Sequence, residues 1–244
     1  MKSSKTAGIL IIGNEILSGK VQDINSFYLA CELRTLGVDV KQISVIPDEI
    51  EIIGREAAEF SGSYDYVFTS GGVGPTHDDV TMAGIAKGFD VKLIRHPDIE
   101  NIFYSRYRES VNSAVLKMTE VPEGAEIIFR EDMRFPVISF RNMFIFPGIP
   151  DYMKNKFDLI KERFRCSEYF LRRIYLNSHE SNIAEILNMA VAGNNDVCFG
   201  SYPVIGRPDY KIIITVESKS EKPMKKALDE LIKGLPEDII VRVE

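Results

Sequence analysis

Residues 64–81 read Tyr-Asp-Tyr-Val-Phe-Thr-Ser-Gly-Gly-Val-Gly-Pro-Thr-His-Asp-Asp-Val-Thr and hold the strongest fold signal in the chain. The first six residues are typical of a strand, which runs directly into a glycine-rich loop. Glycine lets the backbone turn tightly and approach a ligand, and the amide groups that begin a following helix favour an anion. The stretch therefore predicts a strand, a loop suited to phosphate and a helix over about 79–88.

The sequence around this stretch repeats the alternation of strand and helix. It predicts strands at 7–13 and 38–46 and helices at about 25–36 and 49–60. Strands that alternate with helices indicate a mostly parallel sheet with helices on both faces, a three-layer α/β/α domain. Ligands of such sheets bind outside the carboxyl ends of the strands. We therefore expect loops 13–20 and 70–79 on the same rim.

Further along, the pattern predicts a helix over 98–117, antiparallel strands within 125–146, a turn at 147–150 and a helix over 151–165. From residue 168 it changes to strand 171–177, helix 180–192, strands 197–202 and 210–218, helix 222–233 and strand 238–243. That order is the split pattern of a ferredoxin-like domain. We expect an α/β domain over 1–166 and a smaller ferredoxin-like α+β domain over 167–244, which packs on the first and shapes the site or the oligomer.

Composition excludes several classes of protein. The 244 residues carry a net charge of −6, which argues against a nucleic-acid partner, because backbone binding relies on clustered Lys and Arg. The longest aliphatic run, Ile9–Ile12, is far shorter than the roughly 20 residues of a membrane helix, and the N-terminus lacks a signal-peptide core. The three cysteines are expected to be buried thiols in a reducing compartment. The sequence thus predicts a cytoplasmic protein without a membrane partner.

Acidic residues near both loops allow two interpretations. Thr76 and Asp79 fit a helix cap, which would explain the loop without a ligand. Asp78 and Asp79 are adjacent, however, so one carboxylate is left over and suits a metal ion beside a phosphate. Glu15 is either an exposed loop residue or a metal or ribose ligand on the same rim.

Other polar residues have simpler interpretations. Asn25 is expected to cap the first long helix, and Lys154 and Lys156 are expected to be solvated charges. His77 and Lys20 are the basic side chains nearest to the two loops.

Four ordered motifs resemble the molybdopterin-binding-like superfamily. They are Ile12–Gly19, Asp23–Asn25, Gly71–Thr81 and Phe146–Pro150. The resemblance extends to the N-terminal region of CinA proteins, and is closer to the molybdopterin-binding-like region of FAD synthases, supported by Phe135–Asn142 and Gly200–Pro203.

The resemblance implies a phosphorylated ligand and a metal-dependent reaction. In CinA N-terminal regions and the FAD synthase region the associated reaction is cleavage of a pyrophosphate, in ADP-ribose and in FAD respectively, whereas other members bind molybdopterin. We expect a divalent ion (Co, Mg or Mn) and potassium as helpers. Asp78, Asp79 and Glu15 would then hold the metal and carry catalysis. The substrate would contact Gly71, Gly72, Gly74, Pro75, Thr76, Thr81, Asn25, Gly148 and Pro150. We also expect a homo-oligomer, a dimer or a trimer.

Two departures from the family pattern qualify this expectation. Asn14 stands where the family has Asp, which removes one carboxylate and favours an alternative, a non-catalytic module that binds molybdopterin or a nucleotide. A purely structural scaffold is a third interpretation. The sequence also shows neither the amide-hydrolysing domain of CinA nor the FAD-forming domain of FAD synthases, so we expect neither activity.

Overall fold

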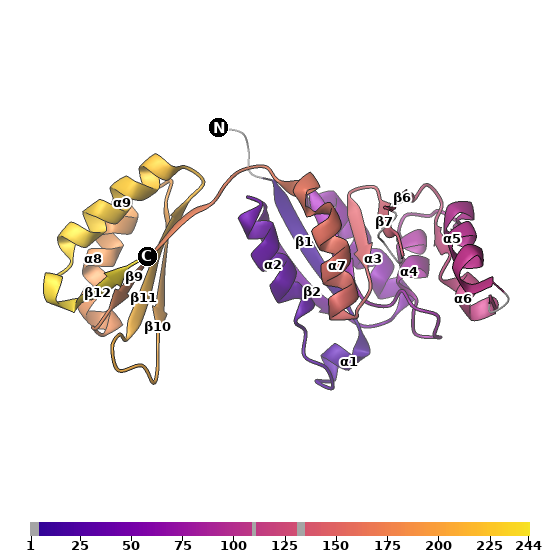
Figure 1. The fold of residues 1–244 in the computed structure, drawn as a ribbon, viewed down its shortest axis with the longest axis horizontal. Coiled ribbons are helices and arrows are strands. Elements are labelled where there is room, and N and C mark those ends of the chain that lie inside the picture. The colour runs from indigo at the N-terminus through magenta and orange to yellow at the C-terminus, as the bar shows by residue number, and fades with distance from the viewer. Residues whose placement is uncertain (1–4, 109–110, 131–134) are drawn as a thin grey trace. The chain divides into compact units, whose positions relative to one another are not determined.

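The computed structural model describes residues 5–108, 111–130 and 135–244. They form two compact units, one up to Cys166 and one from Ser167 onward (Figure 1). The two units are described separately below.

The first unit is built on one mixed sheet. Its six strands lie in the order β2-β1-β3-β8-β7-β6, in which the first four are parallel and β7 is antiparallel to both of its neighbours. The carboxyl ends of β1, β3 and β8 therefore meet at one edge, as the alternating pattern predicts. The strands are β1 (Thr6–Ile12), β2 (Asp39–Ile46), β3 (Tyr66–Ser70), β6 (Glu126–Ile128), β7 (Val137–Phe140) and β8 (Met143–Phe146).

Helices cover both faces of this sheet, because β1 is apolar on both sides. Ile9 packs into a cluster with α2 (Asn25–Thr35) and α7 (Pro150–Ile160). Leu10 packs into a second cluster with α3 (Ile50–Ser63) and α4 (Thr81–Gly88). A strand buried on both faces reads as a continuous aliphatic run, as this one does. The predicted three-layer α/β/α arrangement is confirmed.

The predicted long helix over 98–117 is wrong. The chain forms α5 (Pro97–Tyr107) and a separate short helix, α6 (Ser113–Lys117). Arg108 has a positive φ of 47°, which ends α5, and the Asn112 side chain accepts a hydrogen bond from the Val115 amide, which begins α6. Residues 109–110, in the middle of the predicted helix, lie outside the described residues. Three short elements also escaped prediction: α1 (Asn14–Leu17), β4 (Leu93–Arg95) and β5 (Glu120–Pro122).

The second unit has the expected ferredoxin-like order. Its antiparallel sheet runs β10-β11-β9-β12, and α8 and α9 pack with it around one apolar cluster. The elements are β9 (Phe170–Leu176), α8 (Glu180–Gly193), β10 (Cys198–Pro203), β11 (Ile212–Ser218), α9 (Glu221–Gly234) and β12 (Ile240–Val243). Short 3-10 helices at Lys161–Phe164 and Glu237–Ile239 follow α7 and precede β12.

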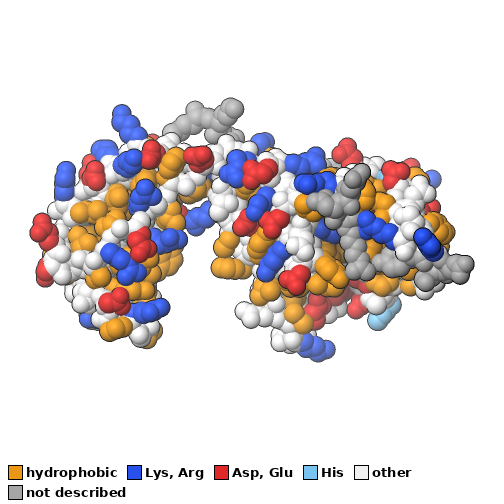
Figure 2. Space-filling model, viewed as in Figure 1, with side chains coloured by type: hydrophobic (Ala, Val, Ile, Leu, Met, Phe, Trp, Pro, Cys, Tyr) orange, Lys and Arg blue, Asp and Glu red, His pale blue; other side chains and the backbone are white. Residues whose placement is uncertain are grey.

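The surface corrects one expectation and sets the charge environment. All three cysteines are free, but Cys31, Cys166 and Cys198 are exposed rather than buried. Among the helices of the described residues, none is long and apolar enough to cross a bilayer. Lys and Arg side chains lie among Asp and Glu over the face seen in Figure 2.

Candidate functional site

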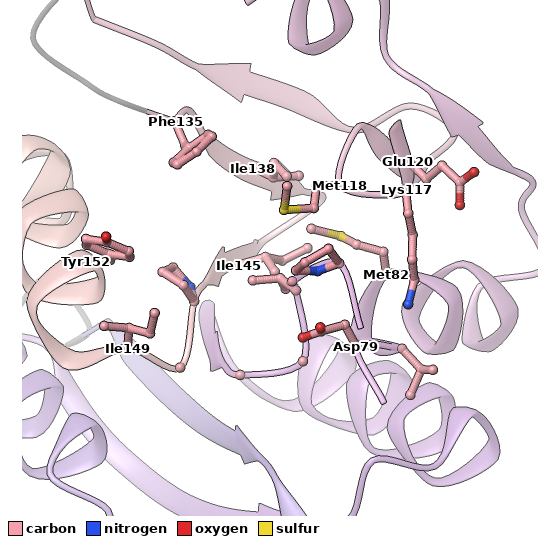
Figure 3. Close-up of a pocket in the computed structure, with 18 of the residues that line it drawn as sticks. Asp79, Met82, Lys117, Met118, Glu120, Phe135, Ile138, Ile145, Ile149 and Tyr152 are labelled. Atoms are coloured by element: carbon pink, nitrogen blue, oxygen red, sulfur yellow. The ribbon is translucent and has the colours of Figure 1, made fainter. Parts of the chain in front are cut away.

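A cavity of about 700 Å³ lies at the carboxyl ends of β3 and β8. Its walls include loop 71–75 after β3, loop 147–150 after β8, and side chains from α5, α6 and α7 (Figure 3). Ligand pockets commonly measure roughly 300–1,000 Å³. The cavity lies on the rim predicted from the strand order, and six of the nine predicted substrate-binding residues line it: Gly71, Gly72, Gly74, Pro75, Gly148 and Pro150.

Loop 71–74 presents main chain rather than side chains to this cavity. Gly71 has φ of 114°, and a Cβ there would lie 2.0 Å from the Ile12 carbonyl oxygen, so only glycine fits. Among the described residues, the N–H groups of Gly72, Val73 and Gly74 have no hydrogen-bond partner. Consecutive amides of a glycine-rich turn that lack internal partners form a concavity suited to an anion. The loop is therefore the natural place for a phosphate group.

Thr81 supports the loop from below. Its hydroxyl donates to the Gly71 carbonyl oxygen at 2.9 Å, and its amide donates to the Gly72 carbonyl oxygen at 3.0 Å. The side chain is buried and does not line the cavity. Thr81 was expected to contact substrate oxygens, whereas the structure places it where it holds the loop on the start of α4.

The three predicted acidic ligands separate into two groups. Asp79 and Glu15 line the cavity, and Asp78 does not. The Thr76 hydroxyl donates to both Asp78 and Asp79, and the Thr76 amide donates to Asp79 Oδ2 at 2.8 Å. Hydrogen bonding from Thr76 lowers the pKa of the Asp78 carboxyl below its ordinary value. Thr76 and Asp79 were expected to cap the following helix. Because α4 begins only at Thr81, their hydrogen bonds order the loop instead.

The donor set fits a cation that is shared with a ligand. Among the described residues, no three His, Cys, Asp or Glu side chains lie together in a way that could hold a metal ion. Glu15 and Asp79 nevertheless face the same cavity. Mg²⁺ is usually bound through one or two carboxylates plus substrate phosphates, rather than by an all-protein cage. The residues present suit such an ion when the phosphate supplies further oxygens.

Asn25 joins the loops instead of capping α2, which corrects the expectation from sequence. Asp23 supplies the cap, since its Oδ1 accepts hydrogen bonds from the amides of Asn25 and Ser26 at 2.9 and 3.0 Å. The Asn25 amide group donates to Ser70 Oγ at 2.9 Å and to the Gly148 carbonyl oxygen at 2.7 Å. Asn25 is buried and lines a second, small cavity of about 60 Å³ beside the main one. It therefore positions the ends of β3 and β8.

The basic residues of the site are not those that the sequence suggested. His77 has a 97% exposed side chain, and neither His77 nor Lys20 lines the cavity. Among the described residues, its basic lining side chains are Lys117 and Lys156. Lys117 donates from Nζ to the Thr76 carbonyl oxygen, which places its charge beside the glycine-rich loop.

Lys156 is not the solvated charge that was expected. Its Nζ donates to the Pro136 carbonyl oxygen at 2.7 Å, and burial lowers the pKa of its ammonium to about 8. Helical spacing carries a signal that the sequence reasoning missed: Lys156 falls three residues after Met153 and four before Ile160, both on the buried face of α7.

Apart from Glu120, whose carboxylate lies 3.8 Å from Arg95 Nε, the other side chains that line the cavity are mainly apolar. Phe135 packs against Phe103 with ring centroids 5.3 Å apart. Figure 3 shows Phe135 and Tyr152 at one end of the cavity and Asp79 at the other. The lining is completed by aliphatic and thioether groups that include Met82, Met118, Ile138 and Ile145. A ligand with both a charged group and a flat ring matches this division.

Two family models match the chain, one on each side of the boundary between the two compact units at residues 166–167. A family model described as "Probable molybdopterin binding domain" matches residues 8–165, and one described as "FAD synthase, middle domain" matches residues 168–244. A protein of Archaeoglobus fulgidus is 37% identical over 222 residues, which are 91% of this chain and 94% of that protein.

Two further relatives carry informative names. A "Probable FAD synthase" of Caenorhabditis elegans is 34% identical over 96% of this chain, which spans 51% of that protein's length. A "CinA-like protein" of Fusobacterium nucleatum is 28% identical over 94% of this chain and 57% of its own length. A crystal structure of the protein CinA from Thermoplasma acidophilum has a TM-score of 0.61 at 26% identity, over 66% of this chain and 100% of that one. The chain therefore belongs to the molybdopterin-binding domain family, and its relatives include a CinA-like protein and a probable FAD synthase.

Proposed function

We propose that this pocket binds a nucleotide pyrophosphate such as FAD or ADP-ribose and hydrolyses it with a divalent cation. The observation that carries the proposal is the group of amides at Gly72, Val73 and Gly74 that have no partner among the described residues. Carboxylates, among them Glu15 and Asp79, and the Lys117 ammonium line the same cavity. Amides and Lys117 suit the phosphate oxygens, whereas Glu15 and Asp79 suit the cation.

Charge balance supports a role for the cation. A pyrophosphate brings about two negative charges to a cavity that already holds three carboxylates, those of Glu15, Asp79 and Glu120, and like charges at close range disfavour one another. Lys117 and the loop amides offset part of this charge. A divalent ion, when bound, would offset more and would lower the pKa of a water molecule for attack on phosphorus.

The chain's own residues position the reacting groups. The loop amides hold the phosphate oxygens, and Lys117 lies at the same end of the cavity. The apolar walls exclude water from the remainder of the ligand. Thr81 and Asn25 do not line the main cavity. Their side chains donate hydrogen bonds to the backbone of loops 71–74 and 147–150, so they hold those loops in position. Preformed amides and a fixed ligand orientation lower the barrier without any side-chain nucleophile.

The test is hydrolysis by the purified full chain. We expect FAD with Mg²⁺, Mn²⁺ or Co²⁺ to yield FMN and AMP, and ADP-ribose to yield AMP and ribose 5-phosphate. A chelator in excess should abolish both reactions. If no metal supports either product while the protein remains folded, the hydrolase proposal is wrong.

A specific observation favours a second candidate, a binding module without turnover. Asn14 supplies no carboxylate, and among the described residues no three acidic, His or Cys groups are preassembled around an ion. We expect calorimetry with FAD or ADP-ribose to separate the two candidates. Equal affinity with and without chelator, together with absence of product, would support the binding module.

A further inference from the structure

The cavity has two chemically different ends. Figure 3 shows Asp79 and the amine of Lys117 at one end, and the rings of Phe135 and Tyr152 at the other. The Gly74 end of loop 71–74 lies at Asp79, since a Cβ added at Gly74 would be 2.7 Å from Asp79 Oδ2, whereas Gly71 lies beside Gly148. If the phosphates lie at that loop, the remainder of the ligand extends toward the two rings.

Lys156 lies at the ring end. It follows Tyr152 by four residues on α7, so the two side chains share one face of the helix. Its Nζ donates to the carbonyl oxygen of Pro136, the residue next to Phe135. The hydrogen bond and the helical spacing together place the ammonium between α7 and the Phe135 segment, at the border of the cavity that it lines.

The bonding capacity of Lys156 is only partly used. An ammonium group has three N–H donors and no acceptor. One of them is directed to Pro136, and no other partner of this Nζ occurs among the described residues. Burying a charged group with incomplete hydrogen bonding opposes folding. Residues that oppose stability in this way are commonly retained for binding or catalysis.

We propose that Lys156 is a ligand-binding residue that selects a flat, fused ring bearing carbonyl oxygens at the ring end of the cavity. The ring would lie against Phe135 and Tyr152, and an N–H of Lys156 would donate to a ring carbonyl. Flavin and pterin rings share this chemistry, whereas adenine offers ring nitrogens and an amino group but no carbonyl. This inference rests on the orientation in the proposed function, with the phosphates at loop 71–74.

The experiment compares matched methionine variants of two lysines on the same helix. Lys156→Met removes the ammonium and keeps a long side chain. Lys154→Met makes the same change outside the cavity, where the Lys154 ammonium lies 5.5 Å above the Tyr28 ring. Lys156→Gln keeps N–H donors without the charge. Affinities of the full chain for FMN, pterin and AMP are measured by calorimetry, and each variant's melting temperature is recorded.

We expect Lys156→Met to weaken FMN binding about tenfold or more, because a hydrogen bond from a charged donor is lost. AMP binding should change by less than about threefold on the same scale. Lys156→Gln should fall between the wild type and Lys156→Met, and Lys154→Met should match the wild type. The melting temperature of Lys156→Met should not fall. Loss of pterin binding in parallel with FMN would identify the shared ring chemistry, and loss of FMN binding alone would assign the site to flavins.

Other outcomes overturn the inference. Unchanged FMN affinity in Lys156→Met would remove the residue from ligand binding, even if the chain hydrolyses FAD. Equal loss of FMN and AMP affinity with a lower melting temperature would show a structural role. Conversely, lysine-dependent FMN binding without any hydrolysis of FAD would refute the hydrolase and leave this inference standing. A wild type that binds none of the three probes would refute this inference, whereas the hydrolase proposal would still be decided by product formation from FAD and ADP-ribose.

Discussion

Lys156 carries a positive charge into a half-buried position beside the cavity, so its ionisation is linked to folding. Burial lowers its pKa from 10.5 to about 8. Between these values the unfolded chain binds a proton that the folded chain does not, so the free energy of unfolding rises with pH over that window. Below about pH 8 the folded protein bears the full penalty of burying the charge, about 3 kcal/mol at 1.36 kcal/mol per pKa unit.

We therefore predict that Lys156→Met is more stable than the wild type at pH 7. The gain should be about 1–2 kcal/mol, because the loss of the bond to Pro136 offsets part of the relief. The difference should shrink as pH rises from about 8 to 10.5. Urea unfolding at pH 7, 9 and 10.5 measures it. A variant less stable than the wild type at every pH would contradict the argument.

The two adjacent aspartates provide a second prediction at this scale. Asp79 lines the cavity and Asp78 does not, although both accept a hydrogen bond from Thr76. Asp79→Asn should lower FAD hydrolysis about a hundredfold or more if it holds the cation, equivalent to about 3 kcal/mol. Asp78→Asn, the matched control, should change it by only a few-fold. Full activity in both variants would remove the metal-ligand assignment.

The sequence predicts the type of site better than its individual residues. Loop 71–79 and Glu15 could be placed on one rim because both follow strands of a parallel sheet, whose carboxyl ends meet at one edge. The burial of Lys156 and the separation of Asp78 from Asp79 depend on which segment packs opposite them. Residue spacing within one element does not encode that information, apart from the weak helical signal in α7.

At the scale of elements, the turn from β3 into α4 should be the least tolerant part of the site. A Cβ at Gly71 would overlap the Ile12 carbonyl oxygen, and φ of 114° is itself unfavourable for L-residues. Gly71→Ala should lower the free energy of unfolding by about 2–4 kcal/mol and abolish ligand binding.

Gly62→Ala is the matched control for this change. Gly62 is an exposed residue of α3, and a Cβ added there would have no neighbour within 4 Å, so alanine should be neutral or stabilising by up to about 1 kcal/mol. Denaturant titration of both variants measures the contrast. A Gly71→Ala protein as stable as Gly62→Ala would show that the turn is not constrained in this way.

Asn25, the first residue of α2, joins the end of β3 to loop 147–150 through its side-chain amide. Asn25→Ala removes hydrogen bonds to Ser70 and Gly148, which are buried or partly buried. We expect a loss of about 1–3 kcal/mol in the free energy of unfolding, together with weaker ligand binding because loop 147–150 is released. Asn155→Ala, at an exposed position on α7, is the control. Thermal unfolding and FMN titration of both variants test the coupling, and an unaltered Asn25→Ala protein would refute it.

Helices and strands with a regular hydrophobic pattern could be predicted from the sequence, whereas the two helices that replace the predicted 98–117 helix could not. Aliphatic Ile9–Ile12 and the spacing of Ile53, Ala57 and Phe60 identify a buried strand and an amphipathic helix directly. The break between α5 and α6 depends on the conformation of Arg108 and on the Asn112 cap, which interrupt a helical pattern without a glycine or a proline. Strands β4 and β5 are too short to show a period.

At the scale of the whole molecule, the cavity belongs to one unit. Every residue that lines it lies within the chain up to Cys166. A protein of residues 1–166 should therefore bind FMN within about threefold of the full chain, a difference of less than about 0.7 kcal/mol. Calorimetry of both proteins measures this. A larger loss would instead support the expectation from sequence that the small unit shapes the site.

The layer order of both units was predictable because it follows from the order of strands and helices and from the handedness of parallel connections. The wall of the cavity that includes Phe103 and Lys117 could not be predicted from the sequence. It is made by α5 and α6, where the sequence pattern is weakest, and these helices lie far from loop 71–74 in sequence. Sequence reasoning therefore found the rim and the loop but not the ring end.

Because the N–H groups of loop 71–74 that lack a partner within the described residues belong to the backbone, part of the proposed ligand recognition does not depend on any side chain. Alanine scanning would miss it, since a substitution there either leaves the N–H in place or breaks the turn. A single-atom change is needed, such as an ester in place of the amide at Val73, installed by protein semisynthesis. Such an ester would remove the N–H alone and keep the Val73 side chain, which packs against the apolar cluster under α3 and α4.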